Sequence, residues 1–169
     1  FITLRSGGTL EMDRDGEVSQ GGSVDATLLG QLHRAVAPHL GGSFARETFS
    51  DPWLSELIPT SVVTADGART LVQLSVELIA QAIEANSLRK NELFVAGGGA
   101  HNSTLMTALR TRMPQFEIDS FDKLGMPGDL REAACFAALG WLFLTGRSGA
   151  DPRITGAKTA QKLGSLALP

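Results

Sequence analysis

Apolar residues recur at helical spacing in two long stretches of the chain. In residues 25–36 they form one stripe, which predicts a helix with Ser23 as its N-terminal cap. In residues 67–86 a broader stripe predicts a second helix, capped by Thr64 or Asp66 and covered over much of its circumference. The stripes consist of Leu28, Leu29, Leu32 and Val36, and of Leu71, Val72, Leu74, Val76, Leu78, Ile79, Ala82 and Ile83.

The centre of the chain alternates between strand-like and helix-like patterns. Residues 93–96 form a short apolar segment, which is followed by three glycines and then by a third amphipathic stretch, residues 103–113. Asn102 is placed to cap the helix predicted there. Residues 116–121 begin with the alternation of a second strand. Together these segments predict a parallel strand–helix–strand unit.

One further apolar run follows. Asp129 and Glu132 have the spacing of a capping box at the start of a helix, with Asp in place of Ser or Thr. Residues 133–144 then predict a tightly buried helix, in which Cys135 is a small core residue. This run is too short to cross a bilayer. The tail, residues 147–169, is rich in turn-forming residues and predicts an irregular cover segment.

Composition narrows the class of protein. The chain has 169 residues, 43% of them hydrophobic and 20% charged, which is typical of a globular domain. A net charge of −3 argues against a nucleic-acid surface. A single cysteine excludes an internal disulfide and suits the reducing cytoplasm, where we expect the protein to act. The chain begins at Phe1 rather than Met, which is consistent with a fragment.

The three glycines, Gly97, Gly98 and Gly99, are the first candidate site. They give up side-chain packing where the backbone turns sharply or passes close to another group. The amides at the start of the following helix can receive a phosphate or a polar ligand edge. The spacing matches neither the lysine-containing phosphate loop nor the dinucleotide-binding pattern. From the residues alone, tight packing is an equally good explanation.

Taken with its neighbours, this element resembles the C-terminal half of the anhydro-N-acetylmuramic acid kinases, in the superfamily of sugar kinases, heat-shock ATPases and actin. The resemblance covers nearly the whole chain. It implies an α/β, helix-rich, actin-like (ribonuclease H-like) fold with a mixed sheet and flanking helices. The segments that carry it are Asp13–Gly16, Arg46–Glu47, Gly97–Asn102, Leu105–Met106, Asp119–Gly125, Asp129–Ala137 and Thr155–Ala157.

The resemblance also implies an activity. The family phosphorylates anhydro-N-acetylmuramic acid with ATP and Mg²⁺ while opening its anhydro bridge, which yields N-acetylmuramic acid 6-phosphate for peptidoglycan recycling. Residues 1–169 would be the single nucleotide- and sugar-binding C-terminal domain of a two-domain kinase whose N-terminal half is absent. The family is usually dimeric, so a homodimer is possible.

The family's site residues map onto specific positions of this sequence. Gly97, Gly98, Gly99 and Asn102 would bind ATP, and Glu132 and Arg46 would bind the sugar. The catalytic aspartate is expected upstream of Phe1, so we expect the chain alone to bind nucleotide without turnover.

Several alternatives stay open. Glu132 could serve only as a helix cap, and Arg46 could form only a surface ion pair with Glu47. The family has Lys and Gly where this chain has Gly42 and Ala45. Because this loop is altered, a levoglucosan kinase is an alternative function. A nucleotide-binding remnant without catalysis, or an ATPase that regulates a partner, are the other possibilities.

Two further motifs favour structural roles. Asp13–Gly16 contains part of a calcium loop, but the remaining ligands are missing, and a solvated turn is predicted instead. His101 has no metal-ligand spacing with His33, His39 or Cys135, so no metal ligand is assigned. We expect His101 to support the glycine turn or to lie near the nucleotide.

Overall fold

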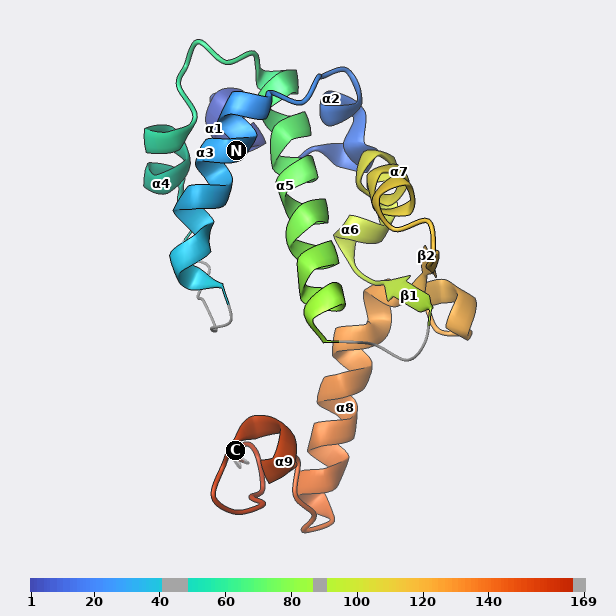
Figure 1. Ribbon diagram of the computed structural model, residues 1–169. Helices are drawn as coiled ribbons and strands as arrows, with labels where there is room; N and C mark the ends of the chain where they lie inside the picture. Colours follow the sequence, from blue (N-terminus) through green and yellow to red (C-terminus); the bar gives the residue numbers. More distant parts are fainter. Residues whose placement is uncertain (41–48, 87–90, 166–169) are drawn as a thin grey trace. The chain divides into compact units, whose positions relative to one another are not determined.

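The computed structural model describes residues 1–40, 49–86 and 91–165. The chain divides into two compact units, Phe1–Ser120 and Phe121–Pro169 (Figure 1). Unit 1 is built around helices and a small sheet. Its elements are α1 (Ile2–Arg5), η1 (Arg14–Gly16), α2 (Glu17–Gln20), α3 (Ala26–Val36), η2 (Ala37–His39), α4 (Asp51–Leu57), α5 (Thr64–Ala85), β1 (Glu92–Val95), α6 (Gly98–His101), α7 (Ser103–Arg112) and β2 (Glu117–Ser120).

The long helix α5 lies between α3 and α7 (Figure 1) and contributes to two hydrophobic cores. On one side Val76 and Ala80 pack with the buried residues of α7 and β2. On the other side Leu74 packs with the apolar stripe of α3. The prediction that this helix is covered over much of its circumference is therefore confirmed. Its apolar positions serve two cores because they spread over more than one face of the helix.

The sheet of unit 1 consists of β1 and β2, paired in parallel with Leu93 opposite Ile118. The connection between them runs through α6 and α7, as a parallel crossover requires. The predicted strand–helix–strand unit is confirmed. These two strands are the whole sheet within the described residues, whereas the family resemblance implies a mixed sheet. The fold is thus helix-rich α/β with a small parallel sheet.

The caps of α3 and α5 differ from the prediction. The carboxylate of Asp25 accepts hydrogen bonds from the amides of Thr27 and Leu28, so Asp25 rather than Ser23 caps α3. Helix α5 begins at Thr64 without a side-chain cap. The carboxylate of Asp66 instead accepts a hydrogen bond from the amide of Ser23, at 2.8 Å. Ser23 and Asp66, both predicted as helix caps, are thus hydrogen-bonded to each other and join the segment before α3 to the start of α5.

The longest helix of unit 2 is α8. The predicted capping box is wrong, because α8 begins at Arg131 and has no side-chain cap. Asp129 lies in the preceding 3-10 turn instead. The elements of this unit are η4 (Phe121–Leu124), η5 (Gly128–Leu130), α8 (Arg131–Leu144) and α9 (Pro152–Thr155).

The prediction that residues 133–144 are tightly buried is also wrong. No described residue of α8 is buried, and the side chains of Phe136 and Leu144 are each 72% exposed. Cys135 is exposed as well, rather than part of a core. An apolar composition shows that a helix could be buried, but burial also needs another element that packs against it. No described helix in either unit combines the length and apolar character that a membrane span needs.

Replacement of Leu109 tests the core between α5 and α7. Its side chain is 1% exposed and packs in the cluster with Val76 and Met113. Leu109→Ala is expected to lower the free energy of unfolding by about 2–5 kcal/mol, because it removes buried methyl groups and leaves a cavity. Urea denaturation measures this change. The control is Leu10→Ala, since Leu10 is 47% exposed, and equal losses in the two variants would contradict the assigned core.

An ion-pair network joins the surfaces of α5 and α7. Arg112 donates to the carboxylates of Glu77 and Glu84, at 2.9 and 3.0 Å. The hydrogen bond from Arg112 is the main reason that the pKa of Glu77 lies below its ordinary value of 4.5. A carboxyl group with a lowered pKa stabilises the fold above its unfolded-state pKa, and this contribution is lost as pH falls through the folded-state pKa.

The acid limb of the stability curve should therefore depend on Arg112. Arg112→Gln is expected to lower the melting temperature at pH 7 and to flatten the loss of stability below about pH 4.5, because Glu77 then titrates at nearly the same pH in both states. Thermal unfolding followed by circular dichroism from pH 7 to pH 3 measures both effects. Arg34→Gln, at an exposed position of α3, is the control. A parallel pH profile in the Arg112 variant and the wild type would exclude the linkage.

Candidate functional site

The glycine turn joins β1 to α6: Gly97 is the N-cap residue of α6, and Gly98 and Gly99 are its first two residues. Gly97 has φ 73° and ψ −166°, a conformation that L side chains rarely adopt. A β-carbon placed on Gly97 or on Gly98 would have no other atom within 4 Å. The main chain of this turn is therefore open, and no described side chain of the molecule fills the space beside it.

The three glycines are explained differently. The backbone conformation accounts for Gly97. At Gly99 an added β-carbon would lie 3.4 Å from Leu105 Cδ2, an ordinary van der Waals contact. Gly98 has neither a positive φ nor a close neighbour, although it lies within the short helix α6. The absence of a side chain at Gly98 thus has no cause inside the described structure.

Asn102 caps the N-terminus of α7, as predicted. Its side-chain oxygen accepts a hydrogen bond from the amide of Leu105, at 2.9 Å. The amides at the start of a helix have no intrahelical partners, and the helix dipole adds partial positive charge there. In the chain, only Ala100 and His101 separate the three glycines from this cap residue.

The turn Asp13–Gly16 docks onto the same end of α7. Thr104 donates its hydroxyl hydrogen bond to the carbonyl of Gly16, at 3.0 Å, and Ser103 donates to the carbonyl of Asp15, at 2.9 Å. Gly16 and Thr104 are buried. The predicted solvated turn is therefore wrong for Gly16, which lies inside a contact between segments 88 residues apart.

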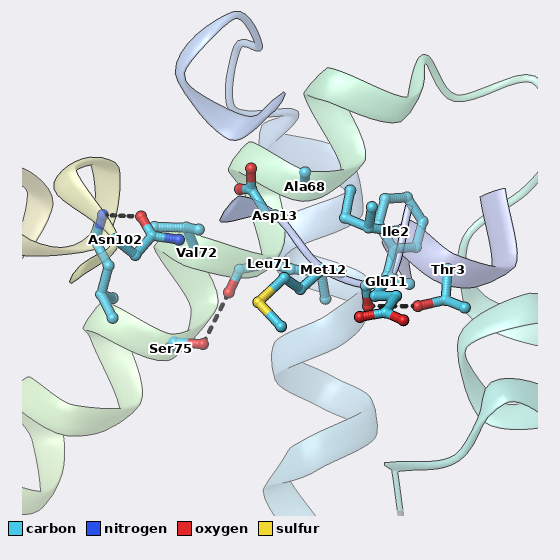
Figure 2. Close-up of a pocket in the computed structure, with 12 residues that line it drawn as sticks. Ile2, Thr3, Glu11, Met12, Asp13, Ala68, Leu71, Val72, Ser75 and Asn102 are labelled. Carbon is cyan, nitrogen blue, oxygen red and sulfur yellow. Dashed lines mark hydrogen bonds between the residues drawn. The ribbon is translucent and has the colours of Figure 1, made fainter. Parts of the chain in front are cut away.

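A pocket of about 420 Å³ adjoins this contact within unit 1. That volume lies in the usual range for small-molecule sites. Figure 2 shows Asn102 at one end of the pocket and Thr3 and Glu11 at the other, with Met12 and Asp13 between them. Helix α5 contributes Ala68, Leu71, Val72 and Ser75, and the remaining lining residues are Phe1, Ile2 and Leu105.

The pocket has an acidic and apolar character. Glu11 and Asp13 carry its carboxylates, and the described residues that line it include no Lys, Arg or His. The Asp13 carboxylate accepts hydrogen bonds from the amides of Val18 and Ser19, at 2.8 and 3.2 Å. The pocket thus suits an uncharged group with hydrogen-bonding edges better than it suits a phosphate. Leu105 borders both the pocket and the glycine turn, so the two features are adjacent.

The other predicted site residues lie elsewhere. Glu132 is in unit 2, where its side chain is 80% exposed and lies 3.7 Å from the guanidinium of Arg131. Arg46 and its neighbour Glu47 fall outside the described residues. His101 is exposed at the end of α6. Within the described parts of the chain, no three His, Cys, Asp or Glu side chains are grouped closely enough to hold a metal ion.

Sequence reasoning missed the hydroxyl pair that joins the two segments of the site. Ser103 and Thr104 follow the cap residue directly, and hydroxyl groups in the first turn of a helix can bond to a neighbouring segment. That signal does not identify the acceptor. The pocket residues on α5 were predicted only as part of its apolar stripe.

The described site lies in a sequence that is similar to one family of known proteins. The sequence model of the family described as anhydro-N-acetylmuramic acid kinase matches residues 3–169. The anhydro-N-acetylmuramic acid kinase of Streptomyces coelicolor is 36% identical over 167 residues, which is 95% of this chain and 42% of that protein. The kinase of Chromobacterium violaceum is 34% identical over 161 residues, covering 91% of this chain and 43% of that protein.

A third relative, the anhydro-N-acetylmuramic acid kinase of Pseudomonas savastanoi pv. phaseolicola, is 35% identical over 159 residues, again covering 91% of this chain and 43% of that protein. The chain thus spans less than half the length of these curated relatives. The match extends over nearly all of the chain. The chain belongs to the anhydro-N-acetylmuramic acid kinase family.

Proposed function

We propose that this chain supplies the ATP-binding part of a carbohydrate kinase that phosphorylates anhydro-N-acetylmuramic acid and opens its anhydro bridge, forming N-acetylmuramic acid 6-phosphate for peptidoglycan recycling. Family membership over residues 3–169 supports this reaction. The curated relatives carry the same kinase name along sequences more than twice as long as the matched part. We also infer the actin-like, ribonuclease H-like fold, which is consistent with the parallel pair β1 and β2 joined through α7.

The observation that carries the proposal is the open main chain at Gly98. Glycine loses more conformational freedom on folding than any other residue, so its presence usually has a cause such as a positive φ or a close neighbour. Nothing in the described structure crowds Gly98. A nucleotide lying against Gly97, Gly98, Gly99 and Asn102 explains why a side chain is absent there.

Charge favours one orientation of the nucleotide. The phosphates are assigned to the side of the glycine turn and the α7 N-terminus, where amides and the helix dipole favour negative charge. The acidic pocket that Asn102 and Leu105 line would repel them and accepts an uncharged group instead. Mg²⁺ would arrive with ATP, because it is usually held by phosphate oxygens, waters and one or two carboxylates rather than by a complete protein cage.

The sugar role of Glu132 follows from the family resemblance. A carboxylate accepts hydrogen bonds from sugar hydroxyls. Among the described residues, its exposed side chain makes only a long ion pair with Arg131, which leaves it available for a ligand. Arg46 is assigned to the same substrate on the resemblance alone. Within a cell we place the reaction in the cytoplasm, where ATP is present.

Blocking the open turn tests the nucleotide site. Gly98→Leu is expected to lower the affinity for Mg²⁺·ATP at least about tenfold, which corresponds to about 1.4 kcal/mol, because the new side chain occupies the space beside the main chain. Isothermal titration calorimetry with a non-hydrolysable ATP analogue measures this loss. Gly30→Leu on α3 is the control, since its nearest neighbour is the flexible end of Arg34. Equal affinities in both variants would remove the turn from the site.

Glu132 is tested through the sugar. In the protein that contains this chain, Glu132→Gln is expected to raise KM for the anhydro-sugar by about tenfold or more, because a charged hydrogen bond to a hydroxyl is lost. The melting temperature should stay unchanged, since the side chain is exposed. A coupled ATPase assay with anhydro-N-acetylmuramic acid measures KM, with Glu56→Gln as the control and levoglucosan as the competing substrate. An unchanged KM would restrict Glu132 to a structural role.

A further inference from the structure

Gly16 is held against Asn102 from several directions. The carbonyl of Gly16 accepts hydrogen bonds from the hydroxyls of Thr104 and Ser19, at 3.0 and 3.1 Å, and Ser19 is completely buried. The Asp13 carboxylate fixes the other side of the turn through the amides of Val18 and Ser19. The position of Gly16 is therefore set by hydrogen bonds on both sides of it.

A side chain added at Gly16 would point toward Asn102, the cap residue of α7. A β-carbon at this position would lie 2.5 Å from Asn102 Oδ1 and 2.9 Å from Thr104 Oγ1, distances at which something must shift. The φ of Gly16 is +82°, which also favours glycine. The Asn102 carboxamide is thus confined between Gly16 and the amide of Leu105, to which it is hydrogen-bonded.

In this position the two polar groups of the Asn102 carboxamide have different roles. Its oxygen is used by the helix cap, so its NH₂ group is the part that can serve a ligand. Asn102 also lines the pocket, where Figure 2 shows it in the same cavity as Asp13. Any shift of the Asp13–Gly16 turn would move this donor.

We propose that Gly16 is a positioning residue that sets the Asn102 carboxamide for nucleotide binding, with the hydroxyl of Thr104 holding the turn in place. The inference rests on the proposed function of the glycine turn and Asn102. Gly16 itself need not touch the nucleotide. Its effect on affinity passes through Asn102.

A matched pair of glycine variants tests the proposal. Gly16→Ala is expected to lower the affinity for Mg²⁺·ATP by about tenfold, the loss of roughly one hydrogen bond. Gly8→Ala is the control, because Gly8 has φ +85° but no atom within 4 Å of an added β-carbon. The control carries the same backbone strain without the clash, so its affinity should stay at the wild-type value.

A double variant separates positioning from general loss of structure. In an Asn102→Ala background, Gly16→Ala is expected to cause little further loss of affinity, because the positioned group is already gone. An equal loss in both backgrounds would overturn the proposal. The side-chain NH₂ signals of Asn102 in a ¹H–¹⁵N spectrum should move in Gly16→Ala and stay in place in Gly8→Ala.

A second variant decides the matter if Gly16→Ala does not fold. Thr104→Val removes the hydroxyl that bonds to Gly16 and adds no atom near Asn102, and Thr107→Val at an exposed position of α7 is its control. Thr104→Val should lower ATP affinity several-fold, whereas unchanged affinity would overturn the inference. If the wild-type chain binds no ATP, the proposed function fails. If it binds ATP and all variants bind equally, only the positioning role fails.

Discussion

Unit 1 depends on one helix that buries two faces. Val76 and Ala80 of α5 are fully buried against α7 and β2, while Leu74 lies in the core shared with α3. Burial of apolar area is the main stabilising contribution in a domain of this size, and here both cores draw it from the same element. Displacement of α5 would therefore disturb α3, α7 and the sheet together. Because α5 also lines the pocket through Leu71 and Ser75, the fold and the candidate site share one support.

The site itself is positioned by polar contacts. Hydroxyl groups on α7 bond to the carbonyls of Asp15 and Gly16, and the first turn of α7 is thereby joined to a segment from the start of the chain. Hydrogen bonds are directional, whereas apolar packing tolerates small sliding movements. The two cores thus determine which elements meet, and the hydroxyl pair determines how the turn and the cap residue face each other.

The sequence predicts the long helices and the two strands of unit 1 because those segments are strongly periodic, whereas the short helices α1, α2, α4 and α6 were not predicted. The stripes of α3 and α5, the Asn102 cap and the parallel crossover are all local patterns, and the structure confirms them. The docking of Gly16 could not be predicted, since its partner Thr104 lies 88 residues away. The acceptor is a backbone carbonyl, which every residue has, so the residue type does not identify it. The cap of α3 was misassigned for a related reason. Ser23 and Asp25 are both good caps, and only the structure shows which of the two side chains bonds to the helix.

The prediction for α8 failed for a different reason. Its composition describes what the helix can bury, and the exposed side chains of Phe136, Trp141 and Leu144 show that unit 2 does not cover them. Hydropathy is a property of one segment, whereas burial requires two. The same limit applies to Glu132, whose capping role depended on a helix start at Asp129 that the structure moves to Arg131.

The choice of asparagine at position 102 adds a final argument about the ligand. Aspartate caps a helix as well as asparagine does, and it would also complement the helix dipole. It would, however, place a negative charge beside the glycine turn and offer no donor. Asn102 caps α7 with its oxygen and keeps two N–H donors. The residue therefore suits a ligand that presents acceptor oxygens or ring nitrogens next to negative charge, which is the chemistry of a nucleotide.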